Sequence, residues 1–346
     1  MKICRVNDVK IERIATALPH QEIALADYAP QLVTVKQAKR LSKGTGFEAL
    51  RISDDNVTTS DLCAVAAEQL LQDYDRGEIA GLIFVTQTPD YILPATSHIL
   101  QARLGLSNDV VCMDLNQGCS GYVEGIYVAS LLCKNLKGKV LLLAGDTISK
   151  LTSPEDRATR IIFGDAGTAT LVSSGEGRMC AGKSQSCPGK KGLTFGFASY
   201  GERASAIQVS NSRHRFIDQV ENPGFLSLHG DAVMDFTLDD VYDAIQEFCH
   251  ITDGDVDRYG LLAFHQANKM ILSSLAEKLG VSTEKLPFSA SRIGNTSSAS
   301  LPLILSNYAG DERLRNVLCC GFGVGLSVGI CAADFGDTKF YETVEI

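Results

Sequence analysis

The chain has 346 residues, 45% of them hydrophobic, and a formal net charge of −9 at pH 7. This length can bury a large core and is enough for two domains of ordinary size. The negative charge gives no reason to expect nucleic acid as a partner. No apolar run is long enough to cross a bilayer, and residues 1–14 carry charges where a signal peptide needs an apolar core. We therefore expect a cytoplasmic protein with no membrane segment.

The eleven cysteines form no C-x-x-C pair and no cluster with histidine at metal-ligand spacing. In a cytosolic protein this pattern favours neither a metal site nor a disulfide framework. We expect most of them to be small core residues, because they lie inside apolar runs: Cys63, Cys133, Cys249, Cys319, Cys320 and Cys331.

The sequence contains an internal duplication. A helical pattern that begins at Asp61 is followed 20 positions later by a strand-like run from Gly81. The same spacing separates a helical pattern at Asp240 from a strand-like run at Gly260. Each copy continues with a helix that ends in Leu-Gly and then with another buried strand. Strands that alternate with helices predict an α/β fold with mainly parallel sheets.

We place the two related halves at residues 1–175 and 176–346. When two copies of one unit pack about a pseudo-twofold axis, equivalent loops face each other across the junction. Clefts between such units are common ligand sites. Functional side chains from both halves are therefore expected to meet there.

The first candidate is Cys119, which lies between a predicted strand and a predicted buried helix in the stretch 111–135. With Gly118 and Gly121 on either side, we expect the helix to begin at Cys119 itself. Unpaired N–H groups and the helix macrodipole favour a thiolate at that position. A cysteine chosen at random is more often a packed core residue, so the assignment depends on its companions.

The companions are His265 and Asn295, both in the second half. His265 ends a buried strand pattern, and Asn295 lies in a stretch rich in Gly, Ser and Thr. Taken alone, a histidine or an asparagine at such a position more often has a structural role than a catalytic one. Together with Cys119 they form a set suited to acyl transfer. The thiolate attacks an acyl carbon, while a neutral histidine and an asparagine donate hydrogen bonds to a developing oxyanion.

At these three positions the sequence resembles the β-ketoacyl-acyl carrier protein synthase III family of the thiolase superfamily. The resemblance extends along nearly the whole chain, and its most specific motifs are DLNQGCSGY (114–122), FHQAN (264–268), GNTSSASLP (294–302) and GFGVGLSVG (321–329). It implies duplicated α/β halves in a five-layered αβαβα arrangement. It also implies a homodimer, an acyl carrier protein as partner, and no tightly bound cofactor or metal.

The same resemblance implies a decarboxylative Claisen condensation. Cys119 would accept an acyl group from an acyl-coenzyme A or acyl-phosphopantetheine thioester. His265 and Asn295 would then promote decarboxylation of a malonyl thioester, and its enolate would attack the acyl-enzyme to give a β-ketoacyl thioester. The backbone N–H groups of Cys119 and Val324 would form the oxyanion hole. The implied substrate-binding residues are Leu93, Arg157 and Phe322, with Leu93 reaching across the dimer interface.

Several positions depart from the family pattern. The chain has no Trp, and Gly44 stands where members commonly carry an arginine near the adenine end of coenzyme A. Asp235 and Met270 occupy positions where Lys and Arg are common. The best local basic stretch for a phosphopantetheine-bearing partner is then 203–222, although a run of charges is more often a plain surface.

Three other functions remain open from the sequence. The same three residues serve acyl transfer to an oxygen or nitrogen nucleophile without formation of a C–C bond. Type III polyketide synthases and hydroxymethylglutaryl-CoA synthases also use Cys, His and Asn, but the motifs fit them less well. A non-catalytic partner subunit is the third possibility, and the intact set of residues argues against it.

Overall fold

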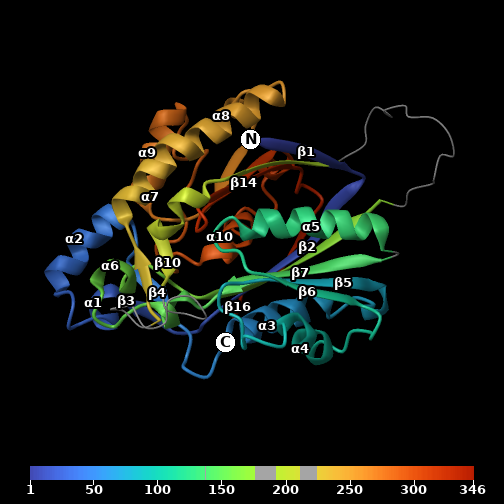
Figure 1. The fold of residues 1–346 in the computed structure, drawn as a ribbon, viewed down its shortest axis with the longest axis horizontal. Coiled ribbons are helices and arrows are strands. Elements are labelled where there is room, and N and C mark those ends of the chain that lie inside the picture. The colour runs from blue at the N-terminus through green and yellow to red at the C-terminus, as the bar shows by residue number, and fades with distance from the viewer. Residues whose placement is uncertain (137, 176–191, 211–223) are drawn as a thin grey trace.

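The computed structural model describes four stretches of the chain: residues 1–136, 138–175, 192–210 and 224–346. They form five layers, in which helices cover the outer faces of two β-sheets and further helices lie between the sheets (Figure 1). The predicted α/β fold with five layers is therefore present.

The larger sheet has seven strands and comes mainly from the first half. Its order is β15 (Lys339–Phe340), β2 (Val9–Leu18), β8 (Ala166–Ser174), β7 (Lys139–Asp146), β5 (Ile79–Val85) and β6 (Val111–Leu115), and β16 (Val344–Glu345) also pairs with β2. Helices α3 (Thr59–Leu71) and α4 (Thr96–Arg103) pack on its outer face.

The smaller sheet has five strands and comes mainly from the second half. Its order is β1 (Lys2–Asn7), β9 (Gly192–Ser199), β14 (Ser327–Ala333), β13 (Val317–Gly323) and β12 (Leu261–Phe264). Outside it lie α8 (Tyr242–Ile251), which packs on β14, and α9 (Lys269–Leu279), which packs on α8. Each end of the chain joins the sheet that comes mainly from the other half. The first strand, β1, belongs to this smaller sheet, whereas β15 and β16 belong to the larger one.

Shorter elements surround the two sheets. Two small antiparallel ribbons pair β3 (Glu22–Ala24) with β4 (Ala49–Arg51) and β10 (Ile207–Val209) with β11 (Leu226–Leu228). The remaining α-helices outside the central layer are α1 (Leu25–Tyr28), α2 (Val35–Thr45), α6 (Arg157–Arg160) and α7 (Gly230–Phe236).

The prediction of mainly parallel sheets is wrong. Parallel pairing holds for β5 with β6 and β7, for β12 with β13, and for β2 with β15 and β16. In contrast, β8 is antiparallel to both of its neighbours and β14 is antiparallel to β13. For β14 the reason is the length of the connection. Only residues 324–326 separate β13 from β14, and so short a link can join only antiparallel strands.

One large core lies between the two sheets, around α5 (Gly121–Asn135) and α10 (Ser300–Ser306). Helix α5 buries Val123, Ile126 and Cys133 against side chains from both sheets, at the spacing of one helical face. The core cysteines predicted from the apolar runs are confirmed as buried. Because both halves contribute to this core, their division at residue 175 stays a prediction about sequence organisation.

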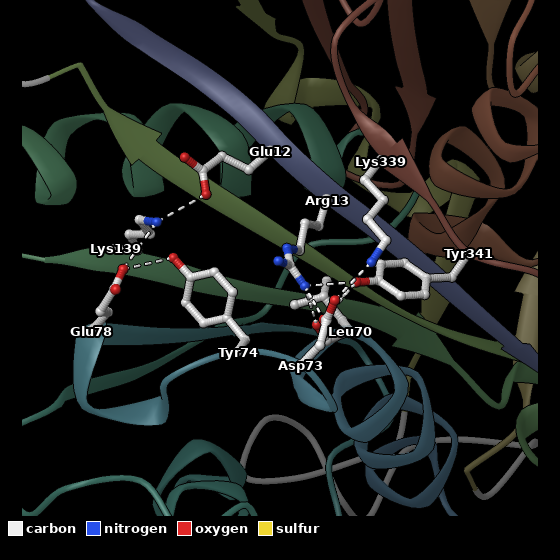
Figure 2. Close-up of polar contacts among 9 residues, drawn as sticks. All are labelled: Glu12, Arg13, Leu70, Asp73, Tyr74, Glu78, Lys139, Lys339 and Tyr341. Atoms are coloured by element: carbon white, nitrogen blue, oxygen red, sulfur yellow. Dashed lines mark hydrogen bonds and ion pairs between the residues drawn. The ribbon is translucent and has the colours of Figure 1, made fainter.

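A polar network attaches the C-terminal strands to the larger sheet (Figure 2). Arg13 on β2 donates to Asp73 and to the hydroxyl of Tyr341, the latter at 2.7 Å, and Lys339 pairs with Asp73 at 3.0 Å. Hydrogen bonds from Lys339 and Arg13 hold the pKa of the Asp73 carboxyl well below its usual value. The end of the chain is thereby tied to the first half.

The two halves also meet through backbone atoms at Phe163 and Asn295. The Asn295 N–H donates to the carbonyl of Ile162 at 2.9 Å, and the Gly164 N–H donates to the carbonyl of Asn295 at 3.1 Å. A Cβ on Gly164 would lie 1.9 Å from the carbonyl oxygen of Ile293. This close approach allows only glycine at position 164.

We expect Gly164→Ala to lower the free energy of unfolding by about 2 kcal/mol or more, because two backbone segments must separate at the junction. Urea denaturation followed by circular dichroism measures this change. Gly201→Ala is the matched control, since a Cβ there meets no atom within 4 Å, and we expect a change of at most about 0.5 kcal/mol. Equal stability of the two variants would contradict the interpretation.

Candidate active site

Cys119 lies in the turn between β6 and α5, with 6% of its surface exposed. The helix begins at Gly121, two residues after the predicted start. The Gly121 N–H donates to the carbonyl of Gly118 at 2.8 Å. This three-residue spacing is that of a tight turn, so Cys119 precedes the helix and does not belong to its first turn.

The end of β13 lies against Cys119. A Cβ on Gly321 would lie 2.6 Å from the carbonyl oxygen of Cys119, and one on Gly323 would lie 2.9 Å from its sulfur. These glycines bring the backbone against the cysteine, as a side chain at either position could not. The next residue is Val324, whose backbone N–H interacts with the thiol, as does the N–H of Cys119 itself. Two backbone donors therefore converge at the sulfur.

The electrostatics at Cys119 differ from the prediction. Burial, together with the negative charge of Asp146, raises the pKa of the thiol to about 11, although the Ser297 hydroxyl and the two N–H groups act in the opposite direction. The expected stabilisation of a thiolate is outweighed by the loss of solvation. In the free protein the group is a thiol, and the reaction must remove its proton.

His265 follows β12 at the end of the buried strand, as predicted. Its N–H donates to the carbonyl of Cys320 at 2.8 Å, and its ring meets the ring of Phe322 edge-on, with centroids 5.5 Å apart. Burial lowers the pKa of the imidazole to about 3, so the ring is neutral near pH 7. Its Nδ1 lies 2.8 Å from the hydroxyl of Ser300, which leaves Nε2 for other partners.

Asn295 is held at both its backbone and its side chain. Its backbone forms the bridge to the first half at Phe163. Its Oδ1 accepts the N–H of Ser297 at 2.9 Å. With Oδ1 held in this way, Nδ2 is the end of the carboxamide that can donate to a substrate oxygen.

The three residues line one cavity of about 920 Å³. Cys119 enters it from the first half, and His265 and Asn295 enter it from the second, as the duplication predicts. Phe322 and Val324 also line the cavity. Much of the remaining wall is apolar, with side chains such as Ile148, Ile207, Leu226, Val233 and Ile271. A cavity of this size and character can hold an extended, largely apolar ligand.

Two predicted substrate-binding residues lie elsewhere. Leu93 is 79% exposed and is absent from the described lining, although its neighbours Tyr91 and Ile92 belong to that lining. Arg157 begins α6, is exposed, and is also absent from the described lining. For a single chain, the structure therefore does not bring either residue to Cys119.

The sequence analysis missed Ser297, which contacts Cys119 and Asn295. It also contacts Ser300, the hydrogen-bond partner of His265. Its hydroxyl lies 4.0 Å from the Cys119 sulfur, its N–H donates to Asn295, and its carbonyl accepts the Ser300 hydroxyl at 2.8 Å. Its φ of 49° is rare for a residue with a side chain, and such conformations are concentrated at functional sites. The sequence showed only that serines were frequent there.

Asp146 at the end of β7 was also missed. It is fully buried and accepts the N–H of Gln87 at 2.7 Å, the hydroxyl of Thr86 at 3.1 Å and the hydroxyl of Ser298 at 3.0 Å. A carboxylate buried in this way joins loops of both halves beneath Cys119. Its signal in the sequence was an Asp at the carboxyl end of a buried strand.

Within the described ranges, no group of three His, Cys, Asp or Glu side chains could hold a metal ion. Within the same ranges, no helix has the length and hydropathy needed to cross a membrane.

The comparisons with known proteins agree along the chain. Residues 113–186 match the family model for 3-oxoacyl-[acyl-carrier-protein] synthase III, and residues 248–335 match the model for its C-terminal part. The β-ketoacyl-[acyl-carrier-protein] synthase III of Streptococcus sanguinis is 31% identical over 334 residues, which cover 94% of this chain and 98% of that protein.

Solved structures lead to the same assignment. The 3-oxoacyl-(acyl-carrier protein) synthase from Burkholderia xenovorans LB400 superposes with a TM-score of 0.90 at 31% identity, covering 100% of this chain and 99% of that one. The synthase III from Thermus thermophilus gives a TM-score of 0.82 at 28% identity, and the match covers 95% of this chain and 99% of that one. The family and the thiolase-like fold predicted from the motifs are thereby confirmed. The chain belongs to the β-ketoacyl-[acyl-carrier-protein] synthase III family.

Proposed function

We propose that Cys119, His265 and Asn295 together carry out the condensation of an acyl group with a malonyl thioester. This reaction is the activity of the family to which the chain belongs, and the predicted class of acyl-condensing transferase is confirmed by that membership. The observation that carries the residue assignment is the shared cavity, in which a thiol, a neutral imidazole and a carboxamide meet. Acyl transfer without formation of a C–C bond is not favoured.

In the first half-reaction the sulfur of Cys119 attacks the carbonyl carbon of an acyl thioester. The thiol must lose its proton, and the neutral ring of His265 can accept it. The oxyanion forms beside the backbone N–H groups of Cys119 and Val324, which already converge at the sulfur. When the tetrahedral intermediate collapses, the leaving thiolate takes the proton. This returns His265 to its neutral form.

In the second half-reaction a malonyl thioester loses carbon dioxide, and the enolate carbon attacks the acyl group on Cys119. His265 Nε2 and Asn295 Nδ2 donate to the enolate oxygen. The Ser300 hydroxyl lies 2.8 Å from His265 Nδ1. The same hydroxyl lies 2.8 Å from the Ser297 carbonyl, and it has one proton to donate. While it donates to that carbonyl, the ring proton is on Nδ1, and Nε2 is free to accept the proton of the thiol in the first half-reaction. The second half-reaction requires the other tautomer, in which the hydroxyl turns to donate to Nδ1 and the ring proton is on Nε2, where the enolate needs it. The sulfur of Cys119 leaves as a thiolate and recovers a proton from solvent.

The acyl donor and the partners belong to this proposal as well. The relatives are named as acyl-carrier-protein synthases, and we infer that this chain uses malonyl-acyl carrier protein and acyl-coenzyme A or acyl-phosphopantetheine thioesters. Arg157 at the start of α6 stays a proposed substrate-binding residue. The absence of a tightly bound cofactor and a cytoplasmic location stay predictions.

We further propose a homodimer. Tyr91, Ile92 and Leu93 are consecutive apolar side chains with 61%, 61% and 79% of their surface exposed. They come from the loop after β5, and β6, the edge strand beside it, exposes Val111 as well. Apolar groups exposed beside an edge strand favour association with a second copy. In that dimer, Leu93 would reach the partner's cavity.

Asn295→Ala is expected to slow release of carbon dioxide from malonyl thioester about a hundredfold, because the enolate loses one hydrogen-bond donor. Acylation of Cys119 should continue, since its oxyanion uses backbone donors. Intact-mass spectrometry after incubation with acyl thioester measures acylation, and radiolabelled carbon dioxide measures decarboxylation. Cys119→Ala is the control that must stay unacylated. An Asn295→Ala protein that folds but is not acylated would count against the assignment.

Alkylation of Cys119 by iodoacetamide should accelerate about tenfold for each pH unit from 7 to 9, because only the thiolate reacts and the pKa of this thiol is raised to about 11. No inflection is expected near pH 6.5, because burial lowers the pKa of His265 to about 3. Peptide mapping at each pH gives the rate.

Asp146→Asn should shift this curve to lower pH, because a negative charge that opposes the thiolate is removed. A circular dichroism spectrum shows whether the variant is folded. An unchanged curve in folded Asp146→Asn would exclude the carboxylate as a cause of the raised pKa.

Light scattering should give a mass of about twice 37.2 kDa. Leu93→Asp should lower that mass toward a single chain by placing a charge in the interface. Val35→Asp, another exposed apolar residue (63%), is the control and should stay dimeric. A monomeric wild-type protein would contradict the dimer.

A further inference from the structure

Helix α2 presents a stripe of four basic side chains to solvent. Lys36, Lys39, Arg40 and Lys43 are all exposed and follow the i, i+3, i+4, i+7 spacing of one helical face. The opposite side of the helix buries Ala38. The helix contains no acidic residue, so this face is uniformly positive in a chain whose net charge is −9.

The stripe is held in place but not neutralised. A capping box between Thr34 and Gln37 begins the helix, and Gly46, at a φ of 83°, ends it. Within the ranges that the structure describes, no carboxylate lies within ion-pair distance of the four cations. Like charges at this spacing repel one another and destabilise a helix. The four charges thus contribute nothing to stability through ion pairs and are available to a partner.

Helix α2 packs against α9, and the first turn of α9 contributes to the lining of the active-site cavity. A Cβ on Gly46 would lie 2.5 Å from the Cβ of Lys269, the first residue of α9. That same end of α9 contributes Met270 and Ile271 to the cavity lining, and Met270 is 52% exposed. A ligand that enters beside Met270 passes the end of the basic helix.

Other basic groups are less available. Arg203 pairs with Asp240 at 2.6 Å, and Lys278 pairs with Asp239 at 3.3 Å. The rest of the predicted basic stretch, residues 211–222, lies outside the described residues. Among the described groups on this side of the cavity, the α2 stripe and its neighbour Lys269 are exposed cations without a carboxylate partner.

We propose that the basic face of α2 is the docking surface for the acidic carrier protein that delivers the thioester to Cys119. This proposal rests on the proposed function, which requires a carrier-bound malonyl group to enter the cavity. The carrier's acidic surface would lie along Lys36, Lys39, Arg40 and Lys43 while its phosphopantetheine arm extends past Met270. Charge complementarity of this kind raises the association rate and orients the partner.

The test compares two double variants with the same change in charge. Lys39→Glu/Arg40→Glu reverses the centre of the stripe, and each new Glu has a Lys one turn away, so we expect the helix to persist. Lys2→Glu/Arg5→Glu is the matched control, because both residues are exposed on β1, in the five-stranded sheet. Condensation is measured at low ionic strength with malonyl-acyl carrier protein and with malonyl-coenzyme A, and fluorescence anisotropy measures binding of labelled holo-acyl carrier protein.

We expect the α2 variant to lose at least about tenfold in kcat/KM with the carrier protein, within the usual range of electrostatic steering. It should lose less than about twofold with coenzyme A, and carrier binding should weaken in parallel. The control should stay within about twofold of wild type for both substrates. Added salt should reduce the difference between wild type and the α2 variant with the carrier protein.

Equal losses with both substrates would overturn the proposal, because the helix would then support the active site or bind nucleotide phosphates. Unchanged binding of the carrier protein by the α2 variant would also overturn it. So would a wild-type protein that binds anionic lipid vesicles through α2 and does not bind the carrier protein there. Failure of the proposed function would give a different result from failure of the docking proposal. A wild-type protein that forms no β-ketoacyl product but binds the carrier through α2 would refute the condensation and support the docking surface.

Discussion

The active site depends on a backbone junction between two similar halves. Asn295 reaches its position because its N–H and carbonyl pair with Ile162 and Gly164 of the first half. Gly321 and Gly323 at the end of β13 lie against the backbone and the side chain of Cys119, respectively. Hydrogen bonds of this kind leave little freedom to the loops that carry the reacting groups. The thiol, imidazole and carboxamide are therefore positioned before any substrate binds.

Burial sets the protonation states at this junction. It keeps His265 neutral, which a donor to an enolate oxygen requires, and it also keeps Cys119 protonated. The buried carboxylate of Asp146 adds to the second effect while it joins the loops of Gln87 and Ser298. The site thus combines precise positions with a thiol that must be activated during the reaction. A protonated thiol reacts more slowly with alkylating agents and oxidants than a thiolate does.

Much of the site could be predicted because its chemistry lies in short motifs. Cys119, His265 and Asn295 stand at strand and helix ends whose order repeats between the halves, and the structure places all three at one cavity. Leu93 and Arg157 could not be placed in the same way, because their proposed contacts involve a second chain or a bound donor. Ser297 and Asp146 were missed because their roles come from a rare backbone conformation and from complete burial.

The sequence by itself determined the fold class, the family, and the identity of the reactive side chains, because local periodicity and motif spacing are properties of the chain. Only the tertiary structure decided the direction of the pKa shifts, the mixed strand directions, and the packing of α2 against α9 at the cavity lining. Each of these depends on groups far apart in the chain. Loss of water around Cys119, for example, results from packing by both halves, and no pattern near position 119 records it.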